Sequence, residues 1–221
     1  MQQLANLLFL RGNIGRPGAG ICPVRGHSNV QGDRTVGVDE KPKPAFLDRL
    51  GQAFAFDPPR AHGHNVVHAI EAMLDGRAKV FIGMGGNFVA AVPDKPLVEA
   101  AMRKLRLTVA VTTKLNRGHL IHGTEALILP CLARSEIDFQ KSGPQSVTVE
   151  DSMSMVHASG GLLAPGSEHL KSEVAIVCGM AKATLPDCGI DWDSFAADYN
   201  RIRDKIEEVF PELFADFDKW D

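Results

Sequence analysis

Three short apolar runs in the middle of the chain constrain its fold more than any other feature. Residues 78–82 (AKVFI) predict a short strand with buried character, and residues 107–111 (LTVAV) and 126–129 (ALIL) predict two further short strands. A helix is expected between the first two, over residues 95–105, with Pro96 in the first turn where proline is tolerated. Alternation of strands and helices is typical of a parallel sheet with crossover helices. We therefore predict an α/β fold with a mainly parallel sheet and flanking helices.

Helical patterns flank these strands on both sides. The helix expected at the N-terminus ends at a glycine cap around Gly12. A chain that opens inside a helix suggests a fragment whose upstream partner lies elsewhere. The further expected elements are helices over residues 45–56, 66–74 (capped by Asn65), 168–185 (capped by Ser167) and one or two within 191–210, and a strand over 147–149.

Residues 11–45 show almost no periodicity, and seven glycines fall between Arg11 and Gly37. Spaced aliphatic residues such as Ile21 and Val30 favour an ordered loop over a flexible linker. We divide the chain into a glycine-rich loop with its preceding helix end (1–37), a cofactor-binding half (38–132), and a C-terminal strand and helical segment (133–221).

Composition excludes several classes of protein. With 221 residues, 44% hydrophobic and 23% charged, the chain has an ordinary globular composition. A formal net charge of −3 gives no electrostatic drive toward nucleic acid. No apolar run approaches the roughly 20 residues of a membrane span. Four cysteines without CxxC spacing predict reduced thiols in a cytoplasmic protein: Cys22, Cys131, Cys178 and Cys188.

Polar and glycine-rich segments follow the first two predicted strands. In parallel sheets, ligands bind beyond the carboxyl ends of the strands, so these segments are candidate binding residues. Glycines there allow close approach of a phosphate or nucleotide, whereas a tight strand-to-helix turn and a solvated loop are equally acceptable interpretations. The candidates are Gly83, Gly85, Gly86 and Asn87 after the first strand, and Thr112, Thr113, Lys114 and Asn116 after the second.

An arginine framed by glycine is the second candidate. Arg25 carries a permanent positive charge and can bind a carboxylate through two parallel hydrogen bonds. The adjacent Gly26 lets the backbone come close to a ligand. His27, Asn29 and Gln31 add donors and acceptors at alternate positions. The pattern favours an anion or cofactor site, and a surface turn is the competing interpretation.

Histidine pairs and an acid–serine–histidine run carry weaker signals. His62 with His64, and His119 with His122, each lack the third ligand that a metal site needs. The run from Glu150 to His157 lacks the G-x-S-x-G turn of a hydrolase. We interpret that run as a helix cap with local hydrogen bonds.

Five segments together resemble one enzyme family. RGNIGRPGAGICPVRGHSNVQGD, FIGMGGNF, LTVAVTTKLNRGH, ALILPCL and VTVEDSMSMVHAS occur in this order over nearly the whole chain. They are similar to the large molybdopterin-dependent oxidoreductases, and closest to formate dehydrogenase-like alpha subunits. Together they are far more specific than any one of them alone.

The resemblance implies a molybdopterin guanine dinucleotide cofactor carrying molybdenum, held between Rossmann-like domains. Arg25 would lie beside the metal and orient a small anionic substrate such as formate. His27 and Ser28 stand where the best-known formate dehydrogenases have glutamine and asparagine; His27 would accept a proton or hydrogen-bond the cofactor.

The resemblance also implies that the metal's protein ligand and an iron–sulfur cluster belong to an upstream region. This chain would then be a central piece of a larger molybdopterin oxidoreductase fold, with the remainder of the enzyme as its partner, and would not turn over substrate alone. The alternatives are a free-standing nucleotide- or pterin-binding module without redox activity and, more remotely, a metal-dependent hydrolase.

Overall fold

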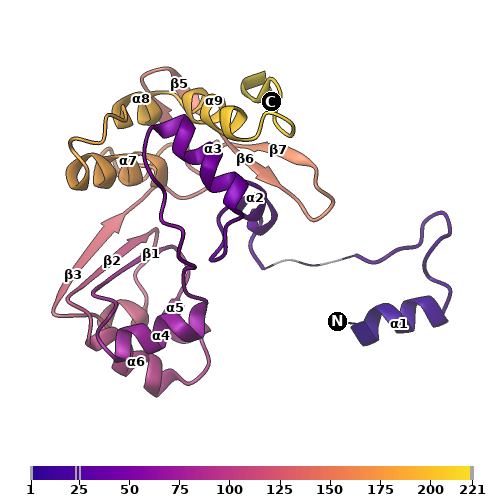
Figure 1. The fold of residues 1–221 in the computed structure, drawn as a ribbon, viewed down its shortest axis with the longest axis horizontal. Coiled ribbons are helices and arrows are strands. Elements are labelled where there is room, and N and C mark those ends of the chain that lie inside the picture. The colour runs from indigo at the N-terminus through magenta and orange to yellow at the C-terminus, as the bar shows by residue number, and fades with distance from the viewer. Residues whose placement is uncertain (1, 23, 25, 220–221) are drawn as a thin grey trace.

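The computed structural model describes residues 2–22, 24 and 26–219. Two lobes make up the body of the molecule (Figure 1). The sheet lobe contains a three-stranded sheet and helices α4, α5 and α6. The helical lobe contains helices α2, α3, α7, α8 and α9 and two β-hairpins. Mixed α/β architecture, with a parallel sheet and flanking helices, agrees with the predicted fold class.

The sheet has the order β1-β2-β3, and both pairings are parallel. Its strands are β1 (Val80–Met84), β2 (Leu107–Thr112) and β3 (Glu125–Pro130). All three predicted strands are confirmed, but β1 extends past Ile82 to Met84. The buried character expected for β1 is wrong, because none of its five residues is buried. Gly83 and Met84 pair with Ala110 and Val111 of β2, so the ladder continues until the positive φ of Gly85 ends it.

Three helices cover one face of the sheet (Figure 1). They are α4 (Val66–Leu74), the short α5 (Phe88–Ala91) and α6 (Lys95–Arg103). Asn65 caps α4 as predicted, because its side chain accepts a hydrogen bond from the His68 amide at 3.0 Å. Between these helices and the sheet lies a buried aliphatic cluster: Ile70, Met73, Val89, Val98, Ala101, Met102 and Leu105.

The helical lobe is assembled from both ends of the chain. Its helices are α2 (Val30–Thr35), α3 (Pro44–Phe54), α7 (Glu173–Thr184), α8 (Trp192–Ala197) and α9 (Asn200–Val209). A short 3-10 helix, η2 (Phe217–Lys219), packs on α9, whereas another, η1 (Arg117–Leu120), contacts α5 in the sheet lobe. Its antiparallel hairpins are β4 (Asp138–Gln140) with β5 (Gly143–Gln145), and β6 (Val147–Glu150) with β7 (Val156–Ser159).

A buried tyrosine links three elements of this lobe. The Tyr199 hydroxyl donates to the Asp138 carboxylate and accepts from the Ser172 hydroxyl, whose oxygen is 2.7 Å away. Burial, together with the neighbouring carboxylate, raises the pKa of Tyr199 above its ordinary value. The hydroxyl therefore stays protonated and keeps donating.

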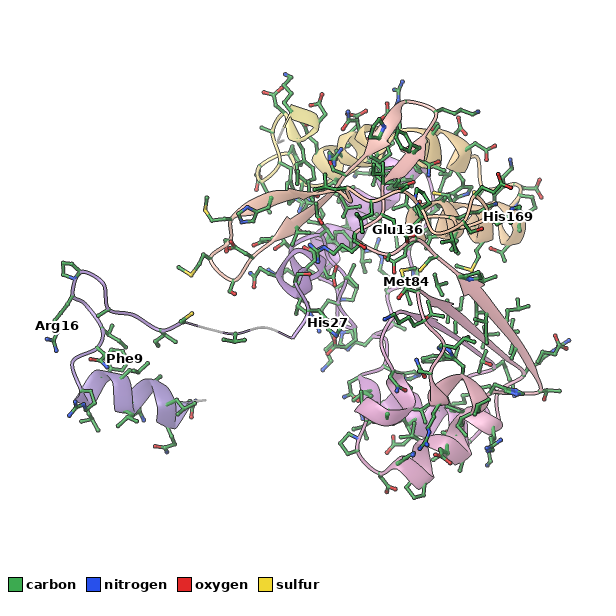
Figure 2. All side chains as sticks on the ribbon, turned by 180° about the vertical axis from the view of Figure 1, so that it is seen from behind. Phe9, Arg16, His27, Met84, Glu136 and His169 are labelled. Carbon is green, nitrogen blue, oxygen red and sulfur yellow. The ribbon has the colours of Figure 1, made fainter. Side chains whose placement is uncertain are left out.

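Helix α1 (Gln2–Leu10) is confirmed, but it lies away from the body of the molecule. Gly12 ends it with a φ of +63°, as the predicted glycine cap requires. Figure 2 shows Phe9 and Arg16 on this outlying segment. None of the residues described in α1 is buried, so nothing in the structure packs against its apolar side chains.

Two sequence-based interpretations of the second half are wrong. Helix α7 begins after Ser172, not Ser167, because the side chain of Ser172 accepts from the Ala175 amide at 3.2 Å. The Glu150–His157 run is not a helix cap. It forms the end and turn of the β6–β7 hairpin, in which the two strands satisfy each other's backbone groups.

The loop expected over residues 11–45 contains helix α2. Sequence reasoning missed this helix because Gly32, in its interior, has a low helix propensity. None of the helices in the described part of the chain combines the length and hydropathy that a transmembrane span requires.

Replacing Leu105 with alanine tests the core of the sheet lobe. Leu105 is 1% exposed within the aliphatic cluster, so Leu105→Ala should lower the free energy of unfolding by about 2–5 kcal/mol through lost burial and a residual cavity. Urea denaturation measures the change. Leu120→Ala is the matched control, because Leu120 is 72% exposed and its loss should cost less than about 0.5 kcal/mol. Equal effects of the two variants would contradict the assigned core.

Candidate functional site

The carboxyl end of the parallel sheet forms a glycine-lined cradle. Gly85 and Gly86 follow β1 with φ values of +64° and +67°, a region that other residues rarely adopt. The Gly85 amide donates to the Val111 carbonyl at 2.8 Å, which ties this turn to the end of β2. A Cβ added to either glycine would meet no atom within 4 Å, so the space above the turn is open.

Asn87 places an unpaired acceptor in this cradle. Its Oδ1 atom is buried and has no hydrogen-bond donor among the described residues. Buried acceptors are rarely left without a partner, because they lose their hydration without compensation. Gly118 approaches the same atom closely: a Cβ on Gly118 would lie 2.7 Å from Asn87 Oδ1 and 2.9 Å from Asn116 Oδ1. The close approach of position 118 to this buried acceptor thus leaves no room for a side chain there.

Asn116 and His119 fix the opposite wall. Asn116 Oδ1 accepts from the Gly118 amide at 2.7 Å, while the Asn116 amide donates to His119 Nδ1 at 3.2 Å. This reciprocal capping box begins η1. The Asn116 side-chain amide also reaches the Gly86 carbonyl at 3.5 Å.

The cavity at this cradle has a volume of about 60 Å³. Since liquid water occupies about 30 Å³ per molecule, the cavity admits the edge of a ligand and does not enclose a whole nucleotide. Five sequence-predicted binding residues line it: Gly83, Gly85, Gly86, Asn87 and Asn116. Gly118, His119 and His122 also line it, and sequence reasoning missed Gly118 and gave the histidines a different role.

Three other predicted binding residues sit at the same strand end but do not line the cavity. The Thr112 hydroxyl is buried and donates to the Lys114 carbonyl at 2.9 Å, so it serves the local turn. Thr113 and Lys114 are exposed beside it.

The glycine-framed loop forms a separate candidate region. Arg25 lies outside the described residues. Gly26 and His27 are exposed, and Figure 2 shows His27 near the junction of the two lobes. Gln31 lies in α2 and is half-buried, and its carbonyl accepts from the Thr35 hydroxyl at 3.1 Å.

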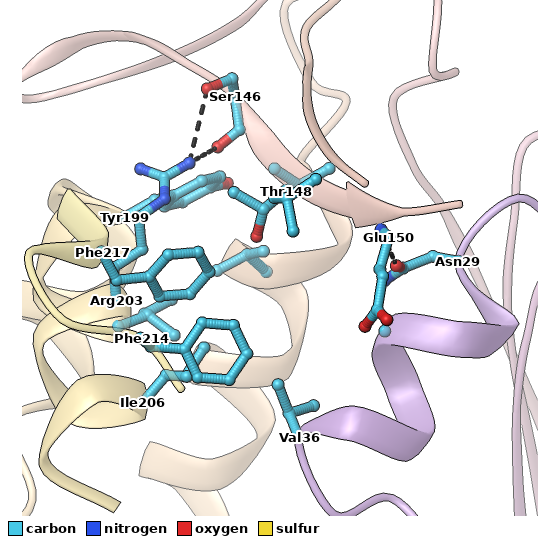
Figure 3. A pocket seen from close by; sticks show the side chains of 15 residues that line it. Asn29, Val36, Ser146, Thr148, Glu150, Tyr199, Arg203, Ile206, Phe214 and Phe217 are labelled. Carbon is cyan, nitrogen blue, oxygen red and sulfur yellow. Dashed lines mark hydrogen bonds between the residues drawn. The ribbon is translucent and has the colours of Figure 1, made fainter. Parts of the chain in front are cut away.

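Two contacts anchor this loop to the β6–β7 hairpin. Asn29 Oδ1 accepts from the Glu150 amide at 2.9 Å, a contact drawn in Figure 3. The Arg134 guanidinium bridges the Ser28 hydroxyl and the Ser159 hydroxyl, the latter at 3.0 Å. The hairpin therefore sets the position of the backbone around His27.

Asn29 also lies at one end of a cavity of about 200 Å³ between α2, β6 and α9 (Figure 3). At its other end, the buried Arg203 donates to the Ser146 carbonyl at 2.7 Å and to Asn200 Oδ1 at 2.6 Å. Most of the remaining wall is apolar, including Val36, Ile206 and Phe214. The contact with Ser146 joins α9 to the residue that precedes β6.

An aspartate–histidine pair occupies the turn of the hairpin. Asp151 Oδ2 and His157 Nε2 are 2.8 Å apart, and Asp151 Oδ1 accepts from the amides of Met153 and Met155. The hydrogen bond to His157 is the largest cause, and the two amides further causes, of a lowered pKa at Asp151. This carboxylate stays ionised and holds the turn closed.

The histidines considered for a metal site do not converge. Within the part of the chain that the structure describes, no three His, Cys, Asp or Glu side chains are placed to hold a metal ion.

The Asp151 contacts predict an acid-dependent loss of stability. A carboxyl with a folded-state pKa below the ordinary 3.8 stabilises the fold above that value, and the contribution disappears as the pH falls through it toward the lowered pKa. Between pH 6 and about pH 3, wild type should therefore lose more thermal stability than Asp151→Asn. Asp57→Asn, at an exposed position, serves as control and should follow wild type. Parallel melting curves for wild type and Asp151→Asn would contradict the assignment.

The chain is similar to several longer proteins. It is 55% identical over 219 residues to Protein YdeP of Escherichia coli strain K12, an alignment covering 99% of this chain and 29% of that protein. It is also 55% identical over 210 residues to a protein of Mycobacterium tuberculosis named as an uncharacterized oxidoreductase, covering 95% of this chain and 27% of the relative. No family model matches the chain.

A more distant similarity involves a formate dehydrogenase alpha subunit of Methanococcus maripaludis, 32% identical over 120 residues, which covers 49% of this chain and 17% of the subunit. The chain thus spans less than a third of the length of these relatives. By sequence, it is homologous to part of longer proteins that include named oxidoreductases.

Proposed function

We propose that this chain is a segment of a molybdopterin guanine dinucleotide-dependent oxidoreductase, similar to formate dehydrogenases, and that its glycine-lined cradle holds part of the cofactor. The relatives named as oxidoreductases support the general class of activity. The formate dehydrogenase subunit supports the narrower class. The ordered set of motifs resembling that family supports the cofactor.

The unpaired Asn87 Oδ1 atom is the observation that carries the proposal. Guanine presents two N–H donors along one edge, whereas the corresponding ring nitrogen of adenine is an acceptor. A buried acceptor in a small cavity at the carboxyl ends of parallel strands therefore suits the guanine end of such a cofactor. In this respect, the residues of the cradle fit the guanine end of the cofactor.

The neighbouring residues supply access and rigidity. Gly85 and Gly86 leave the space above the turn open, so a ligand can approach the backbone. Asn116 and His119 hold the facing wall through their reciprocal hydrogen bonds. We assign contacts with outer parts of the cofactor to the exposed Thr113 and Lys114, whose positions at the strand end leave them accessible.

When bound, the cofactor would supply two-electron exchange with the substrate. In this proposal Arg25 orients a small anion such as formate, because a guanidinium pairs with a carboxylate through two hydrogen bonds. His27 has an exposed imidazole, to which we assign the role of proton acceptor or hydrogen-bond partner of the cofactor. The contacts of Asn29 and Arg134 keep this loop against the hairpin. The metal ligand and iron–sulfur cluster would come from the remainder of the enzyme, which we expect to be cytoplasmic.

Binding of GDP tests the cradle directly. Isothermal titration of the purified chain should detect GDP and give weaker binding of ADP, because adenine lacks the ring N–H donor of guanine. Gly118→Ala should weaken GDP binding by about tenfold, since its methyl group would crowd Asn87 Oδ1 and cost about one hydrogen bond.

Gly179→Ala is the matched control, because a Cβ at this position in α7 meets no atom within 4 Å. It should leave GDP binding unchanged. Equal affinity for GDP and ADP, or full GDP affinity in a folded Gly118→Ala variant, would contradict the assigned site.

The metal content of the full-length protein tests the cofactor. We expect about one molybdenum atom per chain from elemental analysis of the purified full-length protein. A folded full-length protein that contains no molybdenum after expression in a molybdenum-replete host would overturn the proposed class of oxidoreductase.

A further inference from the structure

One face of the parallel sheet exposes a row of aliphatic side chains. Val80, Ile82 and Met84 alternate along β1 and are 50%, 55% and 45% exposed. Leu127 of β3, which is 52% exposed, lies in register with Ile82 through Val109 of the central strand, which is itself only 5% exposed. Helices α4, α5 and α6 cover the opposite face. We call the surface formed by Val80, Ile82, Met84 and Leu127 the open face.

An apolar cleft continues the open face toward the helical lobe. A cavity of about 790 Å³ begins at Met84 and extends between α3, α7 and α8. Figure 2 shows Met84 at the junction of the two lobes. The wall includes Phe56, Val177 and Leu185, which are 47%, 40% and 54% exposed. The α7 helix covers only the end of the sheet, where Ile176 packs on Val111 and Cys131.

Parallel sheets rarely leave one face uncovered, because their strands are apolar on both faces and helices cover each side. Here both faces of β1 carry apolar residues, but helices cover only one of them. Three strands spaced about 4.8 Å apart have outer axes about 10 Å apart, which is the width of one helix. One amphipathic helix of about ten residues would therefore cover the open face.

This chain does not supply such a helix in the structure. The α1 helix is apolar, but it lies apart from the sheet, and its own Leu4, Leu7 and Phe9 are more than half exposed. Among the residues that the structure describes, neither of these two apolar surfaces is covered by a helix. More than two thirds of each long relative lies outside the aligned segment, and this is the polypeptide available to cover them.

We propose that the open face and the adjoining cleft form a docking surface for an amphipathic helix from the part of the full-length protein outside these 221 residues. The inference rests on the part of the proposed function that places this chain in a longer enzyme. It does not depend on the identity of the cofactor.

Cysteine labelling tests this docking surface. Ile82→Cys is introduced into a background in which the exposed native thiols are removed by Cys22→Ser and Cys188→Ser. Maleimide labelling is timed for the 221-residue chain and for the full-length protein that contains it. Labelling at position 82 should be at least about tenfold slower in the full-length protein, because a docked helix must open before the thiol reacts.

Glu168→Cys is the matched control, because the Glu168 side chain is 88% exposed and belongs to the segment before α7 and not to the sheet. It should react at the same rate in both proteins. If Ile82→Cys fails to fold, Leu127→Cys repeats the test from β3. Equal labelling of the sheet cysteine in the folded short and full-length proteins would overturn the proposal.

Two other occupants give distinguishable results. Protection in the short chain that grows with concentration and accompanies a doubled mass by light scattering would assign the open face to a second copy. Protection in the short chain that is lost on deletion of residues 2–10 would assign it to α1. Either result would overturn the proposal. Slow labelling in a full-length protein without molybdenum would support the docking surface while removing the proposed cofactor.

Discussion

Parallel pairing of β1, β2 and β3 is the constraint on which the rest of the structure depends. Parallel strands begin at one edge of a sheet and end at the other, so whatever follows β1 must meet whatever follows β2. This brings Gly85 and Asn87 against Asn116 and Gly118, about thirty residues further along the chain. The ladder persists to Met84 and then stops, because two consecutive glycines with positive φ turn the chain away from the sheet.

The cradle and the glycine-framed loop are positioned by different lobes. Sheet pairing and the η1 capping box hold the cradle, whereas the β6–β7 hairpin holds the loop through Asn29 and Arg134. Tyr199 in turn ties α9 to Ser172 and Asp138 in the helical lobe. An elongated cofactor lying between two such supports would contact both, and the proposed function requires this arrangement.

The uncovered apolar surfaces have the same physical origin as the small size of the cradle cavity. Strands that are apolar on both faces need a second layer of helices, and a nucleotide needs more than one wall to be enclosed. This chain provides one layer of helices and one wall. Its relatives are more than three times as long as the segment that aligns. The docking proposal assigns the missing layer of helices, and the proposed function the missing wall, to polypeptide outside the segment.

Periodicity and local chemistry determined much of the secondary structure. The three parallel strands, the Asn65 cap and the Gly12 cap all depend on residues that are close in sequence, and sequence reasoning located them. Sequence reasoning failed where tertiary contacts decide between two local structures that the same residues could form. The Glu150–His157 run carries helix-capping residues, but pairing with a neighbouring strand made it a hairpin. Ser167 and Ser172 are both plausible caps, and the Tyr199 contact buries the second.

Sequence alone determined that glycines and amides follow two parallel strands, and hence that Gly83, Gly85, Gly86, Asn87 and Asn116 would gather at one edge of the sheet. Only the tertiary structure decided which polar atoms there are free. The Thr112 hydroxyl donates a hydrogen bond within its own turn. Asn87 Oδ1, beside Gly118, has no donor among the described residues. The reason is physical: strand order follows from local patterns, but the satisfaction of a buried hydrogen-bonding group depends on neighbours that only folding brings together.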